Sequence, residues 1–272
     1  MAQLVEIRNG DIRVQVAPAN GGMIAQILLG DREVLSLEPA ALELAPMKAG
    51  GNPVMFPFAS KTAGDAYTLE GKRYSMPFHG LVKNASFGVR ELREDRITLW
   101  RDSCAAEMAA NYPFAYELEL CYRVAGSSVI LESRITNRSD RPMPHCFGWH
   151  PYFKATDKSN LRFSYDMVTH YDYNACQDLE APGELDLSRW WDDVFHTGTP
   201  GFAFENPADG YRVTCRAEDA FQVLVVCSWI EGAMCLEPWC GIPNSPNNGR
   251  FLQWIAPGEE KAYRVELELE KL

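Results

Sequence analysis

The sequence predicts an all-β protein, with large and mainly antiparallel packed sheets and few or no helices. Two observations support this fold class. Apolar residues alternate with polar ones along most of the chain, and 20 glycines and 17 prolines are scattered at turn spacing between the alternating runs. Alternation with a period of two is typical of half-buried strands. No low-complexity linker or repeat divides the chain, so we expect a single domain over residues 1–272.

The alternation is clearest at three places along the chain. Near its start, Ile12, Val14 and Val16 fall on one face, after an Asn9-Gly10 pair that signals a tight turn. In the middle, apolar residues at 118, 120, 122 and 124 alternate with Glu117, Glu119, Cys121 and Arg123, and residues 264–270 alternate between charged and apolar side chains near the end. Each run predicts a strand with one face in the core.

The best candidate for a helix is the segment DSCAAEMAANY at 102–112. It is short and Pro113 closes it, so it forms one or two turns or only a loop. The start of the chain, MAQLVEIRNGD, carries charges where a signal peptide would need an apolar run. No stretch approaches the roughly 18 apolar residues of a membrane span. We therefore expect a soluble, cytoplasmic protein.

Composition limits the partners. With 272 residues, 46% of them hydrophobic, the chain can bury a substantial core. Its net charge of −11 disfavours nucleic acid and anionic membrane, since either would need a basic face. A neutral small molecule is the simplest partner. Nothing in the sequence decides between a monomer and a homodimer.

The eight cysteines form no CxxC pair and fall mostly within apolar runs. Without an export signal, we interpret them as reduced and buried small hydrophobic residues rather than as a disulfide framework or a zinc site. They lie at positions 104, 121, 146, 176, 215, 227, 235 and 240.

Two ionisable residues stand directly before prolines among aromatic and small residues, His150 in CFGWHPYF and Glu237 in LEPWCGIPNSPNN. A residue before proline is extended, which places His150 near a strand end on the same face as the small residues Gly148 and Cys146. Glu237 shares a face with Cys235. A carboxylate in apolar surroundings has its pKa raised, as suits a general base near neutral pH. Each residue also has a structural interpretation, as a hydrogen-bonded core histidine or a paired carboxylate.

A third segment, residues 52–87, contains His79 in a Pro-Phe-His-Gly turn. Polar side chains there could bind sugar hydroxyls, with an aromatic face for the C–H surface of the ring, or could simply form a solvated turn. The polar candidates are Asn52, Lys61, His79 and Lys83, and the aromatic ones are Phe78, Trp149 and Trp239.

Six segments follow one another along the chain: NPVMFPF, YTLEGKRYSMPFHG, YPFAYELELCYRV, ITNRSDRPMPHCFGWHPYF, DDVF and CLEPWCGIPN. With these segments in this order, the sequence resembles the aldose 1-epimerases, or mutarotases, of the galactose mutarotase-like superfamily. The resemblance implies a β-supersandwich and a cofactor-free, metal-free interconversion of the α and β anomers of an aldose. It implies that Glu237 is the general base, that His150 is the general acid for the ring oxygen, and that His79 binds the ring oxygen or a neighbouring hydroxyl.

The chain departs from the family pattern at two cationic positions. Lys61, in FASKTAG, stands where the family commonly has an arginine, and Lys83 stands near the place of another. At both positions a lysine ammonium group replaces the planar guanidinium group of arginine, so the pattern of sugar hydroxyls that the site recognises can differ. The substrate-binding aspartate of the family falls in WWDDVF, and we favour Asp192 over Asp193.

Three other functions fit parts of the sequence. An epimerase of hexose 6-phosphates needs a cationic cluster, for which Lys61, Lys72, Arg73 and Lys83 are the candidates. A non-catalytic sugar-binding module should lack the acid or the base, and both are present. A glycosidase could use Glu237 and Asp192 as its paired carboxylates.

Overall fold

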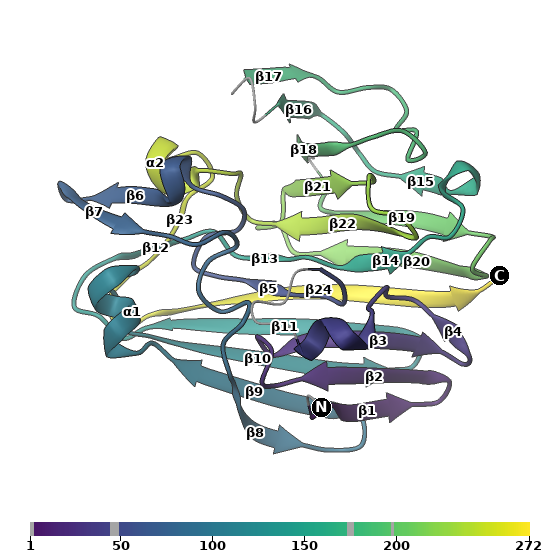
Figure 1. Ribbon diagram of the computed structural model, residues 1–272, viewed down its shortest axis with the longest axis horizontal. Helices are drawn as coiled ribbons and strands as arrows, with labels where there is room; N and C mark the ends of the chain where they lie inside the picture. Colours follow the sequence, from purple (N-terminus) through teal and green to yellow (C-terminus); the bar gives the residue numbers. More distant parts are fainter. Residues whose placement is uncertain (1–2, 44–48, 173–176, 197–198) are drawn as a thin grey trace.

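A computed structural model describes residues 3–43, 49–172, 177–196 and 199–272. Strands dominate it, and within these residues every pairing between the strands given below is antiparallel (Figure 1). The all-β prediction is confirmed.

Two sheets of eight strands form the body of the protein. The first has the order β15 (Arg162–Ser164), β19 (Gly201–Asn206), β20 (Tyr211–Ala217), β24 (Glu260–Lys271), β11 (Ser128–Asn137), β10 (Tyr116–Ala125), β9 (Arg96–Asp102) and β8 (Gly88–Leu92). The second has the order β17 (Gln177–Glu180), β16 (Thr169–Asp172), β18 (Asp192–His196), β21 (Val223–Cys227), β22 (Ala233–Trp239), β13 (Gly148–Trp149) and β5 (Val54–Met55), and β14 (Tyr152–Lys154) also pairs with β22.

Smaller elements surround these sheets. A four-stranded sheet has the order β1 (Val5–Asn9), β2 (Ile12–Ala17), β3 (Met23–Leu29) and β4 (Arg32–Glu33), and it packs against β9, β10 and β24. Two further two-stranded sheets are the hairpin of β6 (Ala66–Leu69) with β7 (Lys72–Ser75) and the long-range pair of β12 (Met143–His145) with β23 (Gln253–Ile255). The helices are α1 (Ala105–Ala110) and α2 (Ser245–Asn248), with single 3-10 turns at Pro39–Glu43, Ala63–Asp65 and Lys158–Asn160.

The alternating runs form the strands that the sequence predicts. In β10, Leu118, Leu120, Tyr122 and Val124 are buried, and the charged residues between them reach solvent in part. The same alternation appears in β2 and β24. Gly10 has φ +55° in the two-residue turn between β1 and β2, a backbone conformation that glycine adopts without strain. Of the segment 102–112, six residues form α1.

Aromatic rings hold the layers together. The ring of Phe147, just before β13, stacks on Tyr263 of β24 with centroids 5.4 Å apart. Trp149 meets Tyr122 of β10 edge to face at 5.8 Å, and Phe153 of β14 meets Phe204 of β19 at 5.0 Å. These contacts fix the second sheet upon the first and so position the residues before and after β13.

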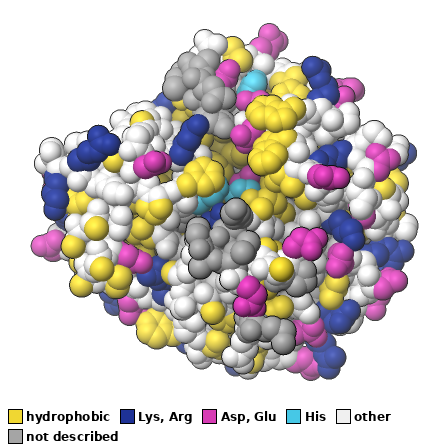
Figure 2. All heavy atoms as spheres, viewed as in Figure 1, with side chains coloured by type: hydrophobic (Ala, Val, Ile, Leu, Met, Phe, Trp, Pro, Cys, Tyr) yellow, Lys and Arg dark blue, Asp and Glu magenta, His cyan; other side chains and the backbone are white. Residues whose placement is uncertain are grey.

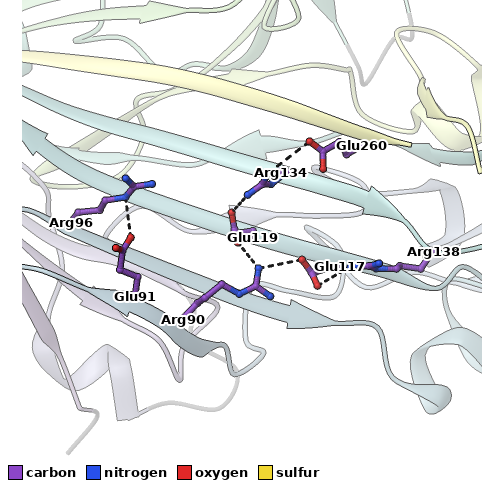
Figure 3. A network of polar contacts seen from close by, with 8 residues as sticks. All are labelled: Arg90, Glu91, Arg96, Glu117, Glu119, Arg134, Arg138 and Glu260. Carbon is purple, nitrogen blue, oxygen red and sulfur yellow. Dashed lines mark hydrogen bonds and ion pairs between the residues drawn. The ribbon is translucent and has the colours of Figure 1, made fainter. Parts of the chain in front are cut away.

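The outer face of the first sheet carries a ladder of opposite charges across β8 to β11 and β24 (Figure 3). Arg90, for example, contacts Glu119 at 2.5 Å and Glu117 at 3.4 Å. Exposed ion pairs of this kind contribute about 0–1 kcal/mol each, so they contribute little to stability compared with the core.

The cysteines are mostly buried and reduced, as the sequence predicts. Six of the seven described cysteines are buried and none forms a disulfide, whereas Cys104 before α1 is exposed. Cys176 lies outside the described residues. Within the described part of the chain, no helix has the length and apolar character needed to cross a membrane.

Candidate active site

A cavity of about 520 Å³ lies against one face of the second sheet, where alternate residues of β18, β21 and β22 line it together with residues of the neighbouring loops. Figure 2 shows histidine side chains at the bottom of a hollow in this face, with hydrophobic side chains on both sides. Most of the polar residues singled out in the sequence line it. The cavity walls include Ser60, Lys61, Phe78, His79, Lys83, His150, Tyr152, Asp192, Cys227, Trp229, Glu237 and Trp239.

Glu237 lies within β22, with only 2% of its surface exposed. The indole Nε1–H of Trp239 donates a hydrogen bond to its Oε2 at 3.1 Å. Burial raises the pKa of the Glu237 carboxyl well above its usual value, the nearby Cys227 raises it further, and the Trp239 bond and the Lys83 charge oppose the rise. Because the carboxyl lines the cavity, a bound molecule can reach it.

His150 follows β13 and is held by its backbone and its ring. Its N–H donates to the Pro53 carbonyl at 3.0 Å, and its ring stacks on Tyr152, with centroids 4.5 Å apart and an angle of 4°. Nε2 lies 3.4 Å from Glu237 Oε2 and 3.4 Å from the Tyr152 hydroxyl. Burial, and next the positive charge of Lys83, lower the pKa of His150 to about 3.

His79 completes the floor of the cavity from a strained turn. It has φ +68°, and its Nδ1 accepts a hydrogen bond from the Ser60 N–H at 3.2 Å, which leaves Nε2 as the protonated nitrogen of the neutral ring. Gly80 is required next to it, because a Cβ there would lie 2.2 Å from the Phe56 carbonyl oxygen. The His79 ring meets the His150 ring edge to face at 5.0 Å.

The remaining candidates divide into those on the cavity wall and those away from it. Lys83 is buried and Lys61 exposed, and both line the cavity. Asp192 also lines it, at the first position of β18. Asp193 instead pairs with His170 Nε2 at 3.2 Å. Asn52 is fully buried but is not on the wall, and its side-chain amide finds no hydrogen-bond partner among the described residues.

Gly148, one of the small residues that the sequence places on the face of His150, does not leave open space beside it. A Cβ at this position would lie 2.7 Å from Cδ1 of Trp239 and 2.9 Å from Cε of Met55. The space that a side chain at Gly148 would need is therefore occupied by the indole of Trp239, which donates a hydrogen bond to Glu237. Of the aromatic candidates, Phe78 and Trp239 line the cavity, whereas Trp149 is buried in the core.

Three residues near His150 and Glu237 were not predicted from the sequence as site residues. Tyr152 stands two positions after His150 in an extended segment, a spacing that places both side chains on one face. Trp229 lines the mouth and is 57% exposed, and no local sequence signal marks it. Cys235 lies beside the pair, where His150, Cys235 and Glu237 bring one ligand atom each to within 4.8 Å of one another.

The floor of the cavity is suited to moving one proton. Burial disfavours both the imidazolium and the carboxylate, so the His150–Glu237 pair holds one proton between two adjacent groups. Transfer of that proton from Glu237 to His150 produces a base and an acid side by side. Groups matched in this way can remove a proton at one end of a short chain of atoms and deliver one at the other.

Comparison with known proteins identifies a family. The family model described as aldose 1-epimerase matches residues 3–268. The chain is 29% identical over 112 residues to the chromosomal protein LacX of Lactococcus lactis subsp. lactis, covering 39% of this chain and 37% of LacX, so this relative is matched over little more than a third of its length. It is 23% identical over 249 residues to YphB of Escherichia coli (strain K12), covering 80% and 83% of the two chains.

A similar fold occurs among solved structures. The Slr1438 protein of Synechocystis sp. PCC 6803 superposes with a TM-score of 0.93, at 24% identity, over 100% of this chain and 97% of that protein. At this identity the likeness concerns the fold, which is the galactose mutarotase-like fold.

Proposed function

This chain belongs to the aldose 1-epimerase family, and we propose that it interconverts the α and β anomers of a free aldose. The observation that carries the proposal is the buried pair of His150 and Glu237, 3.4 Å apart at the floor of a cavity of about 520 Å³. Pockets of a few hundred Å³ with a few convergent polar groups are typical of small-molecule sites.

The reaction uses the pair in its charge-separated form. The Glu237 carboxylate removes the proton of the anomeric hydroxyl, the C1–O5 bond breaks, and the imidazolium of His150 gives its proton to the ring oxygen. The open aldehyde rotates about C1–C2, and the reverse transfers close the ring on the other face. The pair holds one proton before ring opening and one after it, so no external acid or base is consumed.

The other cavity residues bind the sugar in this proposal. His79 Nε2–H donates to the ring oxygen or to a neighbouring hydroxyl, because Nδ1 is occupied by the Ser60 N–H. Asp192, Lys61 and Lys83 contact hydroxyls from the walls. Asn52 is buried and does not line the cavity, so we assign it no contact with the sugar.

Phe78 and Trp229, both exposed at the mouth, offer faces to the C–H surface of the ring. Neither is needed for the core, and such surfaces are typical of sugar-binding sites when they line a polar cavity.

The cavity favours a neutral sugar over a hexose 6-phosphate. A phosphate dianion normally needs several cationic donors. Arg73 donates to the Gly64 carbonyl at 3.1 Å, and Lys72 lies over the Tyr74 ring, so neither of them lines the cavity. Of the four cationic candidates only Lys61 and Lys83 do. Against a glycosidase, the neighbour of Glu237 at 3.4 Å is His150 rather than a second carboxylate.

The test is the rate of anomer interconversion, followed by polarimetry, for freshly dissolved α-aldoses and for the matching hexose 6-phosphates. We expect acceleration over the spontaneous rate with at least one free aldose, and a smaller kcat/KM for its 6-phosphate. Wild-type protein that binds aldoses without accelerating their exchange would contradict the proposal and favour a binding module. Faster exchange of the phosphorylated sugars would contradict the substrate class.

A further inference from the structure

The floor of the active-site cavity combines three different metal-binding side chains. The ligand atoms of His150, Cys235 and Glu237 lie within 4.8 Å of one another, and all three residues are buried. Two of them line the cavity, so a small cation can reach them. Imidazole, thiolate and carboxylate together are ligands of Zn²⁺ and of its heavier relative Cd²⁺.

The distance within the pair also fits two ligands of one metal ion. His150 Nε2 and Glu237 Oε2 are 3.4 Å apart. Two such ligands on a tetrahedral zinc ion, each about 2.0–2.1 Å from the metal, are separated by about 3.4 Å. The second contact of Nε2, to the Tyr152 hydroxyl, is also 3.4 Å.

The sulfur of Cys235 needs a small movement to join them. A zinc thiolate ligand at about 2.3 Å lies about 3.6 Å from a nitrogen or oxygen on the same tetrahedral ion. Cys235 lies directly opposite Cys227 in the pairing of β22 with β21, and Cys227 lines the cavity. The neighbouring strand therefore offers a second thiol beside the three ligands.

We propose that His150, Cys235 and Glu237 form a binding site for a soft divalent cation such as Zn²⁺ or Cd²⁺. Bound as thiolate and carboxylate, Cys235 and Glu237 supply two negative charges, which balance the charge of the ion in a buried site. Binding releases their protons to solvent. The ion occupies the lone pairs of the acid and the base, so it excludes catalysis rather than assisting it.

The inhibitory consequence rests on the proposed anomer exchange, but the binding itself does not. We therefore expect two separate readouts. Cd²⁺ gives a thiolate-to-metal charge-transfer absorption in the ultraviolet, one ion per chain, whether or not the protein is an enzyme. Where anomer exchange is measured, Zn²⁺ slows it in competition with the sugar, and a chelator restores the rate.

The experiment titrates Cd²⁺ into protein that carries Cys104→Ser, which removes the one exposed thiol among the described cysteines. Cys235→Ala is compared with the matched control Cys215→Ala, a single buried cysteine on β20 of the other sheet. We expect Cys235→Ala to lose the absorption and to weaken binding at least tenfold, and Cys215→Ala to retain both. Circular dichroism verifies that each variant is folded.

Binding to Cys235→Ala with unchanged affinity and absorption would overturn the proposal, as would loss of binding in Cys215→Ala alone. If Cys235→Ala fails to fold, Glu237→Gln serves in its place, since it removes one charged ligand and should weaken Cd²⁺ at least tenfold. Cadmium binding without any anomer exchange would contradict the proposed function and leave the metal site standing.

Discussion

His150 and Glu237 have pKa shifts in opposite directions for the same physical reason. Burial opposes the positive form of the imidazole and the negative form of the carboxyl. A second proton would make the pair cationic, and loss of the last proton would make it anionic, so both changes are disfavoured. The state that holds one proton, which the proposed reaction needs, therefore spans a wide range of pH.

The first prediction concerns the pH profile of kcat/KM for anomer exchange. We expect its acidic limb to lie below pH 6.5, toward about 3, because the folded pKa of His150 is lowered by burial and by Lys83. Rates corrected for spontaneous exchange and measured from pH 4 to 9 test this. Lys83→Met removes one of the two causes, so it should move the limb to higher pH. An inflection at pH 6.5 in the wild type, unmoved by Lys83→Met, would contradict the assignment.

At the residue scale, the sequence indicated part of the site. His150 and Glu237 could be identified because ionisable residues before prolines in apolar segments are unusual, and the family resemblance gave them roles. The approach of Lys83 to the pair could not be predicted from spacing, because it depends on contacts between segments far apart in the chain. Trp229 could not be found either, since a single tryptophan in a loop has no periodic pattern.

Among the elements, the short strand β13 determines by its packing where the indole that contacts Glu237 lies. Gly148 pairs with Trp239 on one side and with Met55 on the other. Because glycine has no side chain, the indole of Trp239 can lie against the backbone of Gly148. The indole in turn donates to Glu237 at 3.1 Å. A close approach between two strands thus orients the carboxyl of Glu237, the proposed base.

Gly148→Ala should therefore damage both stability and activity. A Cβ at 2.7 Å from the indole forces Trp239 to move, and overpacking of this kind costs about 1–3 kcal/mol. We expect the free energy of unfolding, measured by urea denaturation, to fall by that amount, and we expect kcat to fall as well. Gly183→Ala is the control, because a Cβ there meets nothing within 4 Å, and its effect should stay within about 0.5 kcal/mol. Equal stability of the two variants would show that Gly148 has no such packing role.

Strand periodicity predicted the elements more completely than the site. β2, β10 and β24 were predicted because each keeps one face in the core and one toward water. β13 has two residues, buried on both faces, and gives no alternation to read. The order of strands across a sheet is set by long-range packing, such as Phe147 on Tyr263, which local patterns do not contain.

For the molecule as a whole, buried histidines make the fold sensitive to acid. His145 is fully buried against Tyr263, and burial, then Lys261, lower its pKa to about 3. Its unfolded pKa is about 6.5. Between these values the unfolded chain binds more protons, so the stabilising contribution is fully present above pH 6.5 and is lost as the pH falls toward 3.

The free energy of unfolding should therefore fall with pH by up to about 1.4 kcal/mol per pH unit for each such histidine below pH 6.5. Urea denaturation at pH 7.0, 6.0, 5.0 and 4.5 measures the slope. His145→Gln removes one titrating group, and we expect its slope to be smaller by about that amount, whatever its stability at pH 7. A variant with the wild-type slope would contradict the buried, neutral state of His145.

The most direct test of the central claim is magnetisation transfer between the α and β C1 signals of the preferred aldose, measured by NMR at equilibrium. Wild type is compared with Glu237→Gln and with Glu231→Gln, a carboxylate of the same type that is exposed in the loop before β22. We predict that Glu237→Gln lowers the exchange rate at least 100-fold, the lower range for general acid–base catalysis, with sugar binding retained. Glu231→Gln should exchange at the wild-type rate. A Glu237→Gln protein that exchanges the anomers as fast as the wild type would contradict the claim that Glu237 is the base.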